Sequence, residues 1–243
     1  RVRDAGINLI ETGSPYAVAP GRVRKPDDTN YRVYTPFYKG WLAHGWRDPV
    51  AAPKEINALK PGASQREFPS WSTDCEIPEA GEAAAKKRFE WFKKNALDNY
   101  DEQRNMAGVD GTSKLSAHLK FGTISIREVY DAIKNALGLS DSGKSLIRQL
   151  YWRNFYFVLA NYRTTMGGDG YGHIEKRFKQ LKWTTGQKLQ QYGRALWQDG
   201  STGFPMIDAC IRQLNTIGWM HNRGRLVVSN FLVRLLHIDW RWG

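Results

Sequence analysis

A short polar stretch between two helical patterns carries the side chains best suited to chemistry. Residues 218–225 read Gly-Trp-Met-His-Asn-Arg-Gly-Arg, which brings together an indole, an imidazole, a carboxamide and two guanidinium groups. Such groups can bind an anion or a hydrogen-bonding ligand, and the amides and dipole of a helix N-terminus would add to the arginines. A helix corner with solvated arginines explains the stretch equally well, so the pattern alone leaves both interpretations open.

Two amphipathic helices are predicted to position this stretch. Apolar residues recur at helical spacing from Pro205 to Ile217, with Pro205 suited to a first turn and Gly218 to a C-terminus. A second helix follows and takes up the polar end of the stretch in its first turn. The polar residues of that turn are Asn222, Arg223 and Arg225. The positions predicted to form its buried face are Val228, Phe231, Leu232 and Leu235.

A helix predicted over residues 144–162 has a second face of chemical interest. Gln149, Trp152, Arg153 and Tyr156 recur at i, i+3, i+4 and i+7, so a donor, an indole, a guanidinium and a phenol share one face. A basic and aromatic face is suited to stacking a base and holding a phosphate. An amphipathic interface without a ligand is the alternative.

The segment Gly111 to Ser116 is the third candidate. A glycine and three hydroxyls at a predicted helix start offer donors to phosphate oxygens, and Lys114 adds charge. Ordinary N-capping by Thr112 or Ser113 is the alternative.

Composition limits the class of protein. The 243 residues carry a formal net charge of +12, which favours a polyanionic partner such as nucleic acid, and no apolar run is long enough to span a membrane. Cys75 and Cys210 lie far apart in the sequence, which suits a reducing compartment, so we expect a cytoplasmic monomer. We expect no metal site, because the five histidines lack ligand spacing.

Three regions are predicted. Residues 1–46 show no complete helix period and are interpreted as the end of a preceding domain. Residues 47–80 contain repeated prolines and are interpreted as a linker, and residues 81–243 form a helical domain. The chain begins with Arg1 and stops just after a helical pattern, so we expect a fragment of a longer protein.

Several motifs together resemble the photolyase and cryptochrome family, most closely the bacterial class I cyclobutane pyrimidine dimer photolyases. Their order and spacing agree over nearly the whole chain. The segments that carry the resemblance are 100–104, 111–122, 149–156, 203–208, 219–225 and 238–242.

The resemblance implies a mainly α fold: an all-helical FAD domain, cut before its last third, that follows the tail of an α/β (Rossmann-like) antenna domain. The residues implied to hold FAD are Tyr100, Thr112, Ser113, Lys114, Leu115, Ser116 and Asn222. The residues implied to contact DNA are Arg104, Gln149, Trp152, Arg153, Tyr156, Asn222, Arg223 and Arg225. Within that set, the lesion pocket would include Gln149, Trp152 and Asn222.

The resemblance also implies electron transfer. Trp183 and Trp240 match the outer and middle tryptophans of the family's photoreduction chain, and the inner one would lie beyond Gly243. Since part of the flavin pocket would also lie there, we expect low flavin occupancy in residues 1–243. A second antenna chromophore, a folate or a deazaflavin, is expected in the complete protein.

The expected function is light-driven repair of ultraviolet-damaged DNA by reduced FAD. Two departures affect the substrate: Gln149 stands where dimer photolyases usually carry glutamate, and Leu226 replaces a common methionine. Asn222 favours the cyclobutane dimer, because enzymes for the other photoproduct carry histidine there. The alternatives are a cryptochrome that signals without repair and a helical nucleic-acid-binding module without flavin.

Overall fold

The fold was analysed in a computed structural model. The structure describes residues 16–51, 53–55, 72–138, 140–165, 181–184 and 186–243. These residues are mainly helical, as predicted, and the only β pairing among them is an isolated bridge between Arg24 and Asn30. No helix in the described ranges is long and apolar enough to cross a membrane.

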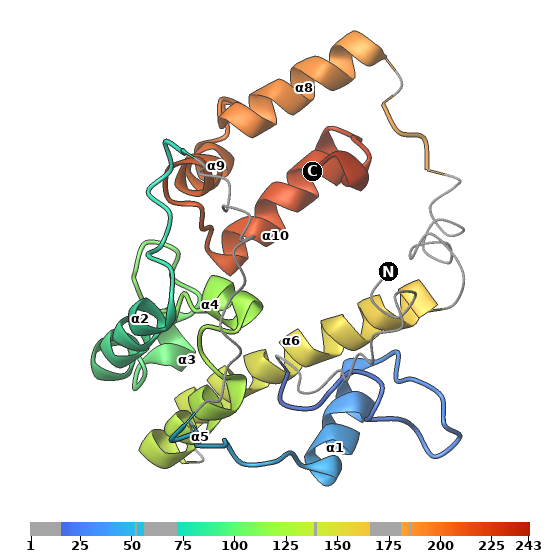
Figure 1. Cartoon of the computed structure of the whole chain (residues 1–243). Coiled ribbons are helices and arrows are strands. Elements are labelled where there is room, and N and C mark those ends of the chain that lie inside the picture. The colour runs from blue at the N-terminus through green and yellow to red at the C-terminus, as the bar shows by residue number, and fades with distance from the viewer. Residues whose placement is uncertain (1–15, 52, 56–71, 139, 166–180, 185) are drawn as a thin grey trace, which may run out of the picture. The chain divides into compact units, whose positions relative to one another are not determined.

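Figure 1 shows the helices in the order in which they follow one another along the chain. Their bounds are α1 Tyr34–His44, α2 Glu82–Asn95, α3 Tyr100–Gln103, α4 Ser116–Phe121, α5 Ile126–Leu137, α6 Asp141–Thr165, α8 Gln187–Asp199, α9 Pro205–Ile217, α10 Asn222–Asn230, η1 Phe231–Leu235 and η2 Trp240–Trp242.

The chain divides into two compact units, which are described separately. The first comprises residues 1–49, 81–106 and 110–179, and the second comprises residues 50–80, 107–109 and 180–243. The predicted domain boundaries at residues 46 and 80 remain a prediction. The glycine-rich segment 167–172, interpreted from sequence as a loop, lies outside the described residues.

In the first unit, α6 packs along α5, α3 and α1 (Figure 1). The helix is longer than predicted, and its apolar face is buried as its spacing requires: Tyr151, Phe155 and Val158 are at most 4 % exposed. Ser125 caps the start of α5, where its hydroxyl accepts a hydrogen bond from the Arg127 amide at 3.3 Å.

Helix α1 was not predicted, since residues 1–46 show no complete helix period. The helix forms because two residues one turn apart, Phe37 and Trp41, are almost fully buried in the core of the first unit. Its exposed positions carry little periodic signal, so tertiary packing decides the conformation here.

In the second unit, α9 packs against α8 and α10. Its predicted ends are confirmed: Pro205 is in the first turn and Gly218 is the left-handed C-cap, with φ 63°. Gly224 lets α10 approach α9 closely, because a Cβ there would lie 2.7 Å from the Cys210 sulfur. The end of the predicted linker runs beside α9, where the Glu76 amide donates to the Thr216 carbonyl at 2.7 Å.

The buried face predicted after residue 225 is right except at one position. Val228, Phe231 and Leu232 are buried, but Leu235 is 66 % exposed. The reason is the π-helical turn η1, which adds a residue to the turn and rotates Leu235 away from the core.

Candidate functional site

Helix α6 presents the predicted polar and aromatic face. Three of its residues are partly buried, namely Gln149, Trp152 and Arg153, whereas Tyr156 is 62 % exposed. The Gln149 side-chain amide donates to the Ser145 carbonyl one turn earlier at 3.3 Å. Its carboxamide oxygen makes no hydrogen bond with the residues that the structure describes, and it can accept one from a ligand.

Trp152 is held by stacked rings. The Tyr34 ring of α1 lies parallel to the indole, with centroids 3.6 Å apart and an interplanar angle of 3°, and the Tyr156 ring stacks at 5.6 Å. Burial raises the pKa of Tyr34 to about 12, so this ring stays neutral. Sequence reasoning missed Tyr34, because the two rings are far apart in the chain and no local pattern pairs them.

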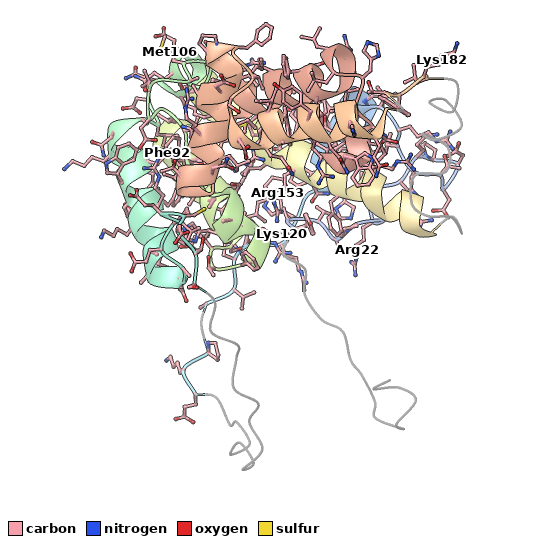
Figure 2. The ribbon with its side chains drawn as sticks, turned by 90° about the horizontal axis from the view of Figure 1, so that it is seen from above. Arg22, Phe92, Met106, Lys120, Arg153 and Lys182 are labelled. Atoms are coloured by element: carbon pink, nitrogen blue, oxygen red, sulfur yellow. The ribbon has the colours of Figure 1, made fainter. Side chains whose placement is uncertain are left out.

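Arg153 joins α6 to α4. Its guanidinium donates to the Leu119 carbonyl at 2.8 Å and lies 4.4 Å from the centroid of the Tyr16 ring. Figure 2 labels Arg153 together with Lys120, the residue after Leu119 on α4. Arg153 therefore connects α6 to α4 and adds positive charge to this face.

The segment 112–116 is not an N-cap of the expected kind. Helix α4 begins at Ser116 with Leu115 as its N-cap and without a side-chain cap, so capping of this helix by Thr112 or Ser113 is wrong. The reason is the left-handed conformation of Lys114, with φ 53°, which turns the chain before the helix starts. The hydroxyls of Thr112 and Ser116 have no hydrogen-bond partner in the described part of the chain.

Arg88 of α2 fixes the shape of this segment. Its guanidinium donates to the Thr112 carbonyl at 2.7 Å and to the Ser113 carbonyl at 3.0 Å, and it pairs with Asp110 at 2.8 Å. Partial burial acts to raise the pKa of Asp110, but hydrogen bonds from Arg88 and Lys114 outweigh it and hold that pKa below its ordinary value. The Leu115 amide donates to the Ser113 hydroxyl at 3.5 Å, so the segment offers the hydroxyls of Thr112 and Ser116, which are donors that suit phosphate.

Tyr100 and Arg104 stand on either side of a residue that contacts Gly111, just before this segment. The intervening residue Gln103 packs so closely on Gly111 that a Cβ on the glycine would be 2.5 Å from the Gln103 Cβ. Tyr100 is 6 % exposed, and the Arg104 guanidinium lies 5.8 Å from its ring centroid. The first unit therefore contains the predicted tyrosine, a cation beside its ring, and the hydroxyl segment.

The second unit holds the other predicted residues at the start of α10. Asn222 and Arg223 are exposed, and Arg225 donates to the Met220 carbonyl at 3.2 Å. His221, which is 2 % exposed, caps the helix by accepting from the Arg223 amide at 3.1 Å. The imidazole therefore has a structural role as a helix cap, which the residue type alone did not predict. The side chains of Asn222 and Arg223 in the first turn of α10 stay at the surface.

Trp183 and Trp240 come from adjoining segments of the second unit. Thr184, next to Trp183, donates its amide to the His237 carbonyl and its hydroxyl to the Leu236 carbonyl, both at 2.8 Å. Trp240 follows three residues after His237 and begins η2. Both indoles are partly buried.

An apolar cavity of about 730 Å³ lies beside the exposed side of α10 and was not predicted from the sequence. Its walls come from the start of α9, from α10 and from η1. Several of its apolar side chains are at least 40 % exposed, namely Phe204, Met206, Leu226, Val227 and Leu235.

Comparison with known proteins identifies the family. Residues 146–243 match the model described as the FAD binding domain of DNA photolyase. A deoxyribodipyrimidine photo-lyase of Alkalihalophilus pseudofirmus is 35 % identical over 94 % of this chain and 48 % of the relative. The enzyme of that name from Escherichia coli is 35 % identical over 92 % of the chain and 48 % of the relative.

The chain belongs to the photolyase and cryptochrome family. Among solved structures, a Synechocystis cryptochrome matches with a TM-score of 0.77 and 30 % identity, over 100 % of this chain and 52 % of the other. A class III photolyase from Agrobacterium tumefaciens matches with a TM-score of 0.78 and 28 % identity, over 99 % and 51 %. The chain therefore spans about half the length of these relatives.

The family match makes FAD the cofactor of this domain, and the donor set fits it. The hydroxyls of Thr112 and Ser116, which have no partner among the described residues, and the turn fixed by Arg88 are suited to a pyrophosphate, and buried Tyr100 belongs to the same unit. Among the described residues no group of three or more His, Cys, Asp or Glu side chains could hold a metal ion.

Proposed function

We propose that the complete protein repairs ultraviolet-damaged DNA in blue light, as a deoxyribodipyrimidine photo-lyase. Relatives of that name align with nearly all of this chain, and the α6 face supplies the chemistry that a lesion requires. The observation that carries the proposal is the stacked and held indole of Trp152, flanked on one helix face by a carboxamide and a guanidinium.

The residues of α6 would bind and orient the lesion. Enzymes that act on a base, photolyases among them, take it out of the helical stack. Trp152 would stack on the flipped dimer, and Gln149 would offer its carboxamide to a pyrimidine carbonyl or imide. The exposed cations Arg223 and Arg225, with Arg104, would bind backbone phosphates, which gives salt-dependent affinity with little sequence preference.

The flavin would be bound in its reduced state. Thr112 and Ser116 would donate to its phosphates, and Tyr100 and Asn222 would also contact it. When bound and excited by blue light, reduced FAD supplies the electron that splits the cyclobutane ring and accepts it back. The protein's part is positioning and exclusion of water. We also propose that Trp183 and Trp240 carry electrons during photoreduction, and that a folate or deazaflavin serves as antenna.

The test uses the complete protein, reduced chemically and mixed with ultraviolet-damaged oligothymidylate under blue light. Recovery of thymine absorbance in light and not in darkness is expected. The matched variant is Gln149→Glu, which restores the residue usual in dimer photolyases and should repair at least as well. If reduced flavin is bound and no absorbance returns with either protein, dimer repair is wrong for this chain.

The second candidate is a cryptochrome that senses blue light without repair. The similarity to the Synechocystis cryptochrome over the whole chain favours it as the alternative. Bound flavin with light-dependent redox change, together with equal affinity for damaged and undamaged DNA, would support this candidate.

A further inference from the structure

A second polar cavity lies in the first compact unit. It has a volume of about 540 Å³ and is bordered by the C-terminal end of α1, the first turn of α5 and the segment before Arg22. Four basic side chains and one indole line it: Arg22, His44, Arg47, Arg127 and Trp46. None of its lining residues is among the predicted flavin or DNA contacts, so the proposed function does not account for it.

The positive charge of this cavity is not balanced by the described residues around it. No acidic residue lines it, and neither Arg22 nor Arg47 forms an ion pair in the described ranges. Asp28 pairs with Arg24 at 3.0 Å, and Asp48, which follows Arg47 in the sequence, is exposed and is not among the residues that line the cavity. A concave surface with one sign of charge concentrates the potential and attracts anions.

Helix electrostatics do not explain so many cations. The C-terminus of α1 favours a positive charge, but its dipole amounts to about half a charge and His44 already lies in its last turn. Arg127 is in the first turn of α5, where the dipole disfavours a cation. Its guanidinium is fixed there by hydrogen bonds to the Ala17 carbonyl at 3.1 and 3.4 Å.

Trp46 supplies a flat apolar wall. Its ring lies 4.4 Å from the Trp41 ring and 4.3 Å from the Tyr130 ring, which it meets edge to face at 86°. The indole is therefore held by packing, while its partly exposed surface lines the cavity. A fixed indole beside guanidinium groups suits a ligand that has both an aromatic base and a phosphate.

We propose that this cavity binds a free nucleotide, with its base against Trp46 and its phosphates held by Arg22 and Arg47. The volume lies in the range of small-ligand sites. Arginine is suited to phosphate because its planar guanidinium can donate two parallel hydrogen bonds. Arg127 adds positive charge at the wall of the cavity, which His44 also lines.

Calorimetric titration with ADP, adenosine and inorganic phosphate tests the site. ADP should bind more tightly than either of its parts. The double variant Arg22→Gln/Arg47→Gln should weaken ADP binding at least about tenfold, because two charge-assisted contacts are lost. The control Lys39→Gln/Lys87→Gln removes the same charge from exposed positions of α1 and α2 and should leave binding unchanged. ADP held at residues 112–116 would be insensitive to both double variants.

Photocrosslinking with an azido-ADP locates the ligand. Label is expected on the peptides that contain Trp46 or Tyr130, and Trp46→Phe should weaken binding while keeping an aromatic packing partner. Equal ADP affinity in the wild type and in Arg22→Gln/Arg47→Gln would overturn the proposal. Inorganic phosphate that binds as tightly as ADP would also overturn it. So would a ten-nucleotide single strand that binds more tightly than ADP and loses as much affinity as ADP does in Arg22→Gln/Arg47→Gln.

Discussion

The contact between Tyr34 and Trp152 makes a quantitative prediction about lesion recognition. A base can stack well only on an indole that is already fixed, and the parallel Tyr34 ring at 3.6 Å is its closest aromatic partner in the described chain. Replacing Tyr34 with leucine removes that ring and leaves the indole free to tilt. An aromatic pair is worth about 0.5–1.5 kcal/mol beyond its buried area, which corresponds to roughly 2- to 12-fold in an equilibrium constant.

The assay is fluorescence anisotropy with two duplexes that differ only by one thymine dimer. Tyr34→Leu should reduce the ratio of damaged to undamaged affinity by a factor in that range. Trp152→Leu should reduce the ratio further, since the stacking surface itself is lost. Tyr34→Phe keeps the ring and loses only a hydroxyl that donates to the Arg148 carbonyl at 3.4 Å, so its ratio should stay within about twofold of the wild type.

Two results would contradict this reasoning. If Tyr34→Leu lowers the free energy of unfolding but leaves the affinity ratio unchanged, the stack serves only folding. If Trp152→Leu weakens binding to both duplexes equally, the indole does not contact the lesion, and the role proposed for α6 is wrong.

Three further predictions concern stability. Gly224→Ala should lower the free energy of unfolding by about 1–2 kcal/mol in denaturant titration, because its Cβ would be 2.7 Å from the Cys210 sulfur, and Cys210→Ala in the same chain should recover part of the loss. A hydrogen bond from the Thr202 hydroxyl, with further backbone donors, lowers the pKa of Asp208. This carboxylate therefore contributes stability that is lost as the pH falls through the lowered pKa. Asp208→Asn should show a smaller loss of stability in acid when thermal unfolding is followed against pH. The pKa of Tyr34 is raised from 10.0 to about 12, so the folded state binds more protons than the unfolded state between these pH values. Stability therefore falls as the pH rises through this range. Tyr34→Phe should lose less stability over the same range when alkaline unfolding is followed by absorbance.

Local signals in the sequence were sufficient for α9 and for the start of α10. Pro205 and Gly218 determine the two ends of α9, because proline fits a first turn and glycine adopts the left-handed cap without strain. The spacing of apolar residues then gives the buried faces. The spacing gives the wrong prediction at Leu235, because a π-helical turn changes the helical period and no residue type in this segment predicts such a turn.

Contacts between distant segments could not be predicted in the same way. Helix α1 depends on the burial of Phe37 and Trp41, which is a property of the packed unit. The turn at residues 112–116 depends on Arg88, which donates to two of its carbonyls from another helix. The sequence indicated which residues could meet a phosphate, but it could not indicate that α4 would begin only at Ser116.

Each side chain proposed to contact the lesion uses one of its groups for a contact within the protein and has another that can contact a ligand. The Gln149 amide donates to its own helix, and its carboxamide oxygen can still accept a hydrogen bond. Trp152 packs its indole against the Tyr34 ring and remains partly exposed. Arg153 is bound to the Leu119 carbonyl, so its charge is fixed in place. Side chains held in this way lose little conformational entropy when a ligand binds, so more of each contact energy contributes to affinity. A lesion site on α6 would for this reason tolerate an exchange of glutamate for Gln149 better than the loss of the contacts that hold Trp152.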